Sequence, residues 1–231
     1  MRLDFLFPRE CAWCGKEGDY LCQQCKQTLT AHPEICPFCH KQSKNFRVCK
    51  NCKELYPTLE GIVIGFAYKD LLKKLIYKVK FFHKKDGIEF LMKRLSLVFR
   101  INESLREKRE KNQIFLSFVP SHWRRKYFEK GYNQSEMLAK ALAKELQIPF
   151  LQVAKKTKYT LSQLHFDRKG RETNLKNAFE CLVLTKIPLH ASIVIVDDVT
   201  TTGSTILELS KVIKESRSDL HVRGLVIARH M

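Results

Sequence analysis

The stretch that decides the fold is IVIVDDVTTTGST, which runs from Ile193 to Thr205. Its first four residues are all β-branched and predict a fully buried strand of a parallel sheet. Asp197 and Asp198 follow at the strand end, and a loop of small hydroxyl residues leads into an amphipathic run, ILELSKVIKES, that predicts a helix. Loop N–H groups and the positive end of a helix favour a phosphate. Paired carboxylates accept hydrogen bonds from vicinal hydroxyls or help to hold a hydrated Mg²⁺.

This stretch resembles the phosphoribosyl-pyrophosphate (PRPP) signature of type I phosphoribosyltransferases. The resemblance implies that Asp197 and Asp198 act at the ribose hydroxyls and that residues 201–205 wrap the 5′-phosphate. The loop residues expected to bind PRPP are Val199, Thr200, Thr201, Thr202, Gly203, Ser204 and Thr205. A purely structural strand–turn–helix corner with an acidic cap is the alternative. A P-loop is excluded because no GK[ST] motif follows the strand.

Composition favours a polyanionic partner. The 231 residues leave room for one medium-sized domain and a smaller one, and the formal net charge is +18. Nucleic acid is the first candidate for such a partner, ahead of phosphorylated metabolites. No apolar run approaches the ~20 residues of a membrane-spanning helix, and the N-terminus lacks the apolar core of a signal peptide. We therefore expect a cytoplasmic protein.

Eight of the nine cysteines lie before residue 53, in four C-x₂-C pairs. In a cytoplasmic chain this spacing predicts two structural zinc ions, each held by four thiolates, with no open position for catalysis. The expected ligands are Cys11, Cys14, Cys22 and Cys25, then Cys36, Cys39, Cys49 and Cys52. An interleaved cross-brace is the alternative pairing. His40 follows a complete cysteine pair and is expected at the surface.

A basic face follows the zinc region. A strand is expected over 61–68, a helix over 71–82 and a second helix over 88–111, whose last charged run, ESLREKREK, is expected to be its frayed end and a linker. Lys69, Lys73, Lys80 and Lys84 line one side of the first helix around Tyr77. Such a row suits the phosphates and an occasional stacked base of single-stranded DNA. A plain solvated lysine face is the alternative.

A second polar loop is expected after the strand at 114–119. Pro120 and Ser121 begin it, and a basic cluster that includes Arg124 and Arg125 follows. Asn133 or Ser135 then caps a helix with the sequence EMLAKALAKEL. Loops at the carboxyl ends of parallel strands lie together, so this loop and Asp197/Asp198 are expected to share one cleft, with pyrophosphate near the basic cluster.

Three motifs in order resemble the ComF family, bacterial proteins tied to DNA uptake in natural competence. They are VP-x-HWRR-x₅-GYNQS from Val119, T-x₂-QL-x₃-R-x₂-R-x₂-N-x₂-NAF from Thr160, and VDDVTTTGST, all after the paired C-x₂-C ribbons. The resemblance implies an α/β fold, with a type I phosphoribosyltransferase-like parallel sheet flanked by helices and an N-terminal double zinc ribbon. We expect the ribbon at 1–57 and the sheet domain at 58–231.

The same resemblance implies ligands and partners. They are PRPP with Mg²⁺, single-stranded DNA, and a competence helicase or another DNA-processing protein. The middle motif takes the place of the mobile lid of type I phosphoribosyltransferases, so Arg168 and Arg171 are expected to neutralise pyrophosphate on closure. A plain basic linker is the alternative there.

The acceptor side of the site is not evident in the sequence. No stretch of aromatic and amide side chains stands out as a hood over a nucleobase. Three hypotheses therefore stand: a DNA-uptake protein that binds PRPP and single-stranded DNA, an active phosphoribosyltransferase of nucleotide salvage, and a regulator that binds a nucleotide without chemistry.

Overall fold

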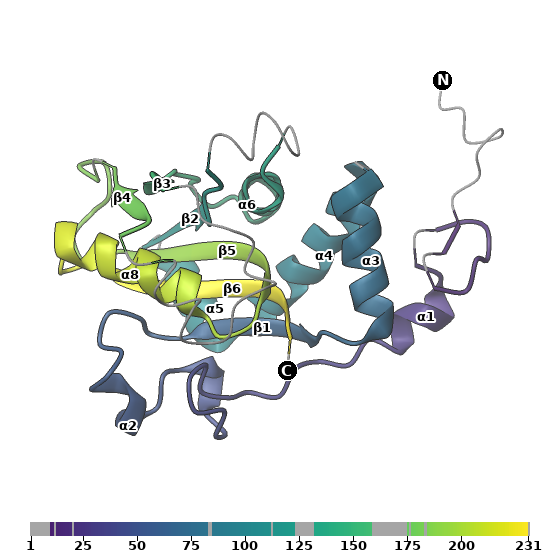
Figure 1. The fold of residues 1–231 in the computed structure, drawn as a ribbon, viewed down its shortest axis with the longest axis horizontal. Coiled ribbons are helices and arrows are strands. Elements are labelled where there is room, and N and C mark those ends of the chain that lie inside the picture. The colour runs from purple at the N-terminus through teal and green to yellow at the C-terminus, as the bar shows by residue number, and fades with distance from the viewer. Residues whose placement is uncertain are drawn as a thin grey trace.

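The centre of the molecule is a parallel sheet with the strand order β1-β6-β5-β2 (Figure 1). The computed structural model describes residues 10–11, 13–19, 21–82, 85–111, 113–122, 132–158, 175, 177–182 and 184–230. The strands are β1 Ile62–Ala67, β2 Ile114–Phe118, β5 Ser192–Thr200 and β6 His221–Arg229. Strand β5 lies between β2 and β6, and Ile193 to Val196 are fully buried, as four β-branched residues predicted.

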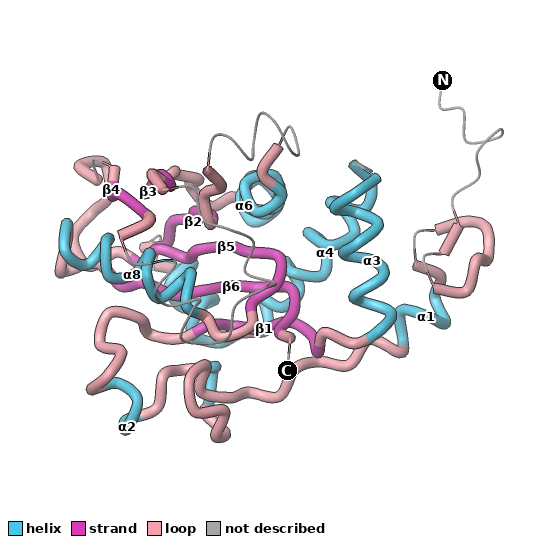
Figure 2. Tube along the Cα trace, viewed as in Figure 1, coloured by secondary structure: helices cyan, strands magenta, loops and turns pink. Residues whose placement is uncertain are grey.

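Helices cover both faces of the sheet. They are α3 Asp70–Phe82, α4 Lys85–Ile101, α5 Glu103–Glu110, α6 Gln134–Leu146 and α8 Ser204–Ser216. Gly65 of β1 approaches Val98 of α4, whereas Gly224 of β6 approaches Ile206 of α8, so α4 and α8 lie on opposite faces. Helix α6 packs with α4 (Figure 2). The predicted α/β fold, a parallel sheet flanked by helices, is confirmed.

The single helix expected over 88–111 is wrong, because the chain breaks at Asn102. The Asn102 side chain accepts a hydrogen bond from the Leu105 N–H at 3.2 Å and so starts α5 as a separate helix. The cap at the start of α6 is Asn133, whose side chain accepts from the N–H groups of Ser135 and Glu136. Asn133 also donates to the Val119 carbonyl oxygen at 3.0 Å, which ties the helix start to the end of β2.

Both edges of the sheet are covered. Residues 30–32 run along β1, where the His32 N–H donates to Gly65 and the Ala67 N–H donates to Thr30. On the other edge, Leu116 of β2 exchanges backbone hydrogen bonds with Pro149 and Leu151. A short antiparallel pair of β3 Ala154–Lys156 and β4 Phe179–Cys181 follows. Unpaired backbone groups at sheet edges invite association, so this cover is a structural safeguard.

The cysteine-rich segment forms two small modules on the β1 side of the sheet. Their short helices are α1 Gln23–Gln27, η1 Lys44–Phe46 and α2 Lys50–Lys53, and Figure 1 shows α1 beside the start of α3 and α2 below β1. The first module buries Leu21 against Leu71 of α3. The second contributes Phe38, Phe46 and Val48 to the main core, so the modules rest on the sheet domain. In the described part of the chain, no helix is long and apolar enough to cross a membrane.

Candidate functional site

Eight cysteines form two four-sulfur clusters. In each cluster the four Sγ atoms lie within 4.8 Å of one another, and Cys14 and Cys22 approach to 3.7 Å. Tetrahedral ligands at the usual Zn–S distance would be about 3.8 Å apart, so both clusters fit a zinc ion. The grouping is the sequential one: Cys11, Cys14, Cys22 and Cys25, then Cys36, Cys39, Cys49 and Cys52. The interleaved pairing is not formed.

The two clusters repeat one local geometry. The Cys22 N–H donates to Cys11 Sγ at 3.4 Å, and the Cys49 N–H donates to Cys36 Sγ at 3.4 Å. Burial raises the pKa of the Cys11 thiol, but nearby N–H groups outweigh it and bring that pKa down to about 6. The same balance brings the pKa of Cys36 to about 7. Stabilised thiolates are the form that binds zinc.

The second cluster is fastened to the end of β6. His40 is exposed, as expected, but its Nε2 atom lies 2.7 Å from Nη2 of Arg229, a side chain that is only 2 % exposed. The same nitrogen donates to the Pro37 carbonyl oxygen at 2.8 Å. Arg229 pairs with Thr200 of β5 in the sheet, so the second cysteine cluster contacts the strand next to the one that leads into the 201–205 loop. The sequence carried no signal for this contact, because the partners are 189 residues apart.

The acid pair and the loop lie at the carboxyl end of β5. Asp197 Oδ1 accepts hydrogen bonds from Ser135 Oγ at 2.6 Å and from the Asp198 N–H at 3.0 Å. Asp198 is turned differently, since its Oδ1 atom accepts from the Val199 N–H at 2.7 Å. The Ser135 contact joins the two polar loops that were expected to meet. The sequence pointed to Ser135 only as a helix cap, but its hydroxyl instead orients Asp197.

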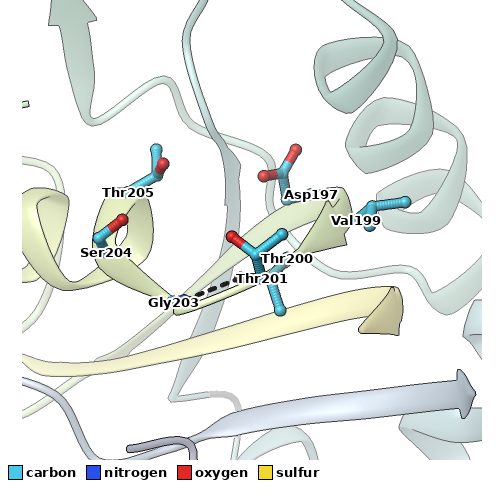
Figure 3. Close-up of a pocket in the computed structure, with 7 residues that line it drawn as sticks. All are labelled: Asp197, Val199, Thr200, Thr201, Gly203, Ser204 and Thr205. Carbon is cyan, nitrogen blue, oxygen red and sulfur yellow. Dashed lines mark hydrogen bonds between the residues drawn. The ribbon is translucent and has the colours of Figure 1, made fainter. Parts of the chain in front are cut away.

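A small, partly open cavity of about 90 Å³ lies against this loop. Its lining residues are Asp197, Val199, Thr200, Thr201, Gly203, Ser204 and Thr205 (Figure 3). In that view the Asp197 carboxylate and the hydroxyls of Ser204 and Thr205 surround the space above the loop, whereas the Val199 side chain points away. Thr202 does not line the cavity, and its Oγ1 atom bonds to Ser204 Oγ at 3.0 Å. The cavity therefore combines a carboxylate, several hydroxyls and the N-terminus of α8.

Gly203 has a conformational role in this loop. Its φ is +79°, its N–H donates to Thr200 Oγ1 at 3.1 Å, and it is the residue before α8. A Cβ atom here would lie 2.7 Å from Ile62 Cδ1 in β1. A side chain at this position would therefore meet the core first.

The remaining predicted residues divide into two groups. Pro120 and Ser121 follow β2 at the same edge of the sheet as Asp197, since the Val119 N–H donates to the Val196 carbonyl oxygen. Ser121 Oγ is buried, and it has no hydrogen-bond partner among the described residues. Neither residue lines the cavity described above. Arg124, Arg125, Arg168 and Arg171 lie outside the described residues.

The basic row is partly described. Lys69 and Lys73 are exposed, and Tyr77 is 56 % exposed on α3. The side chains of Lys80 and Lys84 lie outside the described part. Lys74, which the predicted row did not include, places its Nζ atom 4.8 Å from the ring centroid of Trp13 in the first zinc knuckle. The exposed basic face of α3 thus borders the first zinc knuckle.

Comparisons with known proteins define the class first. The model of the double zinc ribbon domain matches residues 2–53. Adenine phosphoribosyltransferase from Saccharomyces cerevisiae is a solved structure similar to this chain, with 14 % identity, 90 % of this chain and 87 % of that chain covered, and a TM-score of 0.42. The protein therefore combines a double zinc ribbon with an α/β domain built on a parallel sheet.

Two relatives lead from the class to the family. Competence protein F of Haemophilus influenzae is 31 % identical over 211 residues, which cover 90 % of both chains. DNA utilization protein YhgH of Escherichia coli is 28 % identical over 198 residues, which cover 84 % of this chain and 83 % of the relative. The chain belongs to the ComF family of competence proteins.

Proposed function

We propose that the protein acts in DNA uptake during natural transformation and binds PRPP with Mg²⁺ at the Asp197 loop. The names of the relatives, competence protein F and DNA utilization protein, support the process. The observation that supports this ligand is the position of the Asp197 carboxylate, which accepts a hydrogen bond from Ser135 Oγ at 2.6 Å. The carboxylate lines a cavity that hydroxyl side chains at the start of α8 also line. A polyol phosphate needs acceptors for its hydroxyls and donors for its phosphate, and this cavity has both.

Each part of the loop then has a role toward PRPP. Asp197 and Asp198 accept the ribose hydroxyls, while Thr201 and the residues from Gly203 to Thr205 donate to the 5′-phosphate at the start of α8. Carboxylate oxygens suit Mg²⁺, which would neutralise charge on the pyrophosphate. For Arg124, Arg125, Arg168 and Arg171 the proposal rests on their motifs, which put cations where the pyrophosphate would leave.

The test is calorimetric titration of the zinc-loaded protein with PRPP, with and without Mg²⁺. Asp197→Asn keeps the shape of the side chain but removes its charge, and should abolish measurable binding. Ser135→Ala leaves Asp197 without its orienting donor and should weaken binding several-fold. Glu215→Gln, an equal charge change at the exposed far end of α8, is the matched control. Unchanged PRPP affinity in Asp197→Asn, measured on a folded variant, would refute the assignment.

An active phosphoribosyltransferase of nucleotide salvage is the alternative, because the PRPP half of the site is complete in sequence. Such an enzyme would release pyrophosphate when a nucleobase or amine attacks C1 of the ribose. Pyrophosphate release should be assayed across the nucleobases, with and without single-stranded DNA. Release that depends on one base would favour the transferase, and PRPP binding without release would favour the binding protein.

Single-stranded DNA is the second proposed ligand. The net charge of +18 and the exposed Lys69 and Lys73 favour a phosphate backbone. If Z phosphates are neutralised, log K should fall with log salt at a slope near −0.7Z. Replacing both lysines with Gln should make that slope shallower by roughly 1 to 1.5 units. An unchanged slope would mean that these lysines do not touch phosphate.

The proposal also places the protein in the cytoplasm, with a competence helicase or another DNA-processing protein as its partner. Reduced thiols, which two zinc clusters require, are the normal state of cysteine in that compartment. Cell fractionation and co-purification from competent cells test both statements. Recovery with the secreted fraction would contradict the first.

A further inference from the structure

The first zinc module and helix α3 form one continuous surface. Leu71 of α3 is 8 % exposed and packs with Cys11, Leu21 and Cys25 of the module, and Phe90 of α4 closes the same cluster. Figure 1 shows the module beside the start of α3. Side chains that emerge on either side of this junction are therefore held in a fixed relation to one another.

An exposed aromatic row crosses that junction. Trp13 lies between Cys11 and Cys14 and is 44 % exposed, and Lys74 Nζ lies 4.8 Å from its ring centroid. Tyr77 follows Lys74 by three residues on α3, which makes the two side chains neighbours on the helix surface, and it is 56 % exposed. We call these three residues the Trp13 seam.

The internal repeat shows which kind of partner packs on an aromatic ring between the two cysteines of a C-x₂-C pair. Phe38 occupies the same place between Cys36 and Cys39 as Trp13 does between the first two cysteines. Phe38 is only 7 % exposed, because Tyr56 stacks on it with centroids 3.8 Å apart and an interplanar angle of 21°. The second knuckle thus uses its ring to pack a flat aromatic partner from its own chain. The first knuckle presents a larger ring at the surface, with a cation beside it.

We propose that the Trp13 seam stacks an unpaired base of single-stranded nucleic acid. This inference rests on the proposed binding of single-stranded DNA and assigns the residues that contact its bases. An aromatic face accepts any base, and the ammonium groups of Lys73 and Lys74 attract the adjoining phosphates. An apolar partner would leave the positive charge of the lysines without a complement. A strand of stacked bases and phosphates complements both the aromatic rings and the lysines.

The experiment compares oligo(dT) with an abasic oligonucleotide of equal length and charge, by fluorescence anisotropy on the full-length, zinc-loaded protein. Wild type should prefer oligo(dT). Trp13→Ala should weaken oligo(dT) binding about 5- to 150-fold and leave abasic binding unchanged, while Trp13→Phe should keep most of the preference. Lys74→Gln should make the salt slope shallower by about 0.7 for both oligonucleotides.

Two further variants keep the test decisive. Tyr77→Ala lies on α3, away from the thiolates, so it tests the seam even if Trp13→Ala disturbs zinc binding. This variant should also reduce the preference for oligo(dT). Leu189→Ala removes an exposed apolar side chain from the loop before β5 and should change nothing. Binding of oligo(dT) that neither aromatic substitution alters would overturn the seam while leaving DNA binding intact. No binding of either oligonucleotide near physiological salt would instead refute the proposed DNA binding itself.

Discussion

Replacing Gly203 with Ala should destabilise the folded protein by about 2 kcal/mol. A non-glycine residue in the left-handed region costs about 1–2 kcal/mol, and Gly203 has a φ of +79°. The new Cβ would lie 2.7 Å from Ile62 Cδ1, and Ile62 is fully buried, so its side chain must leave its rotamer at a cost of about 0.5–1.5 kcal/mol. Alanine also lowers the conformational entropy of the unfolded chain, which offsets about 0.4–1 kcal/mol of this loss of stability.

A double-mutant cycle separates the two costs. Ile62→Val removes the Cδ1 atom and alone should cost about 0.5–1.5 kcal/mol through the cavity it leaves. In the Ile62→Val background, Gly203→Ala should cost less than in wild type, because the clash with Cδ1 is relieved. The coupling free energy between the two substitutions should be about 1 kcal/mol. The cost that remains belongs to the backbone of the loop.

Urea unfolding with saturating zinc is the assay, since metal loss would otherwise mix with unfolding. The shift of the transition midpoint, at constant slope, measures each loss of stability. A stability of Gly203→Ala within about 0.5 kcal/mol of wild type would refute the predicted loss, and additivity of the two substitutions would exclude the clash with Ile62. Additivity alone would leave the positive φ as the whole cause.

Three more outcomes are expected. Elemental analysis should find about two zinc equivalents per chain by the four-ligand rule, and one or none would contradict the paired clusters. Arg229→Met leaves the Pro37 carbonyl without its donor, so the free energy of unfolding should fall by about 1–3 kcal/mol. A chromogenic chelator should also take zinc from the second cluster faster than in wild type. Equal release rates would contradict the proposed link between Arg229 and that cluster. Arg217 hydrogen bonds hold the pKa of Asp219 well below its usual range, so this pair stabilises the fold above about pH 4 and its contribution is lost as the pH falls further. Asp219→Asn should flatten that acid limb in thermal melts across pH, and an unchanged limb would exclude the pair as its cause.

Much of the fold could be predicted because its signals are local. A run of β-branched residues reports burial on both faces of a strand, and C-x₂-C spacing reports a metal knuckle, whatever the rest of the chain does. The order of strand, acid pair, hydroxyl loop and helix likewise follows from neighbouring residues. The break at Asn102 was missed although its signal is local too. An asparagine that caps the next helix does not interrupt the helical pattern of the residues before and after it, so the two helices look like one.

The sequence by itself determined the eight cysteines of the zinc ribbon, the buried strand β5 and the position of the polar loop that follows it. Only the tertiary structure decided which cysteine pairs share a cluster, that Ser135 orients Asp197, and that Arg229 fastens the second knuckle to β6. It also decided the opposite fates of Trp13 and Phe38, which hold the same place in a repeated motif. The reason is physical: periodicity and spacing record which residues are buried or capped, but a contact between distant residues depends on how separately formed elements pack, and no local pattern encodes that register.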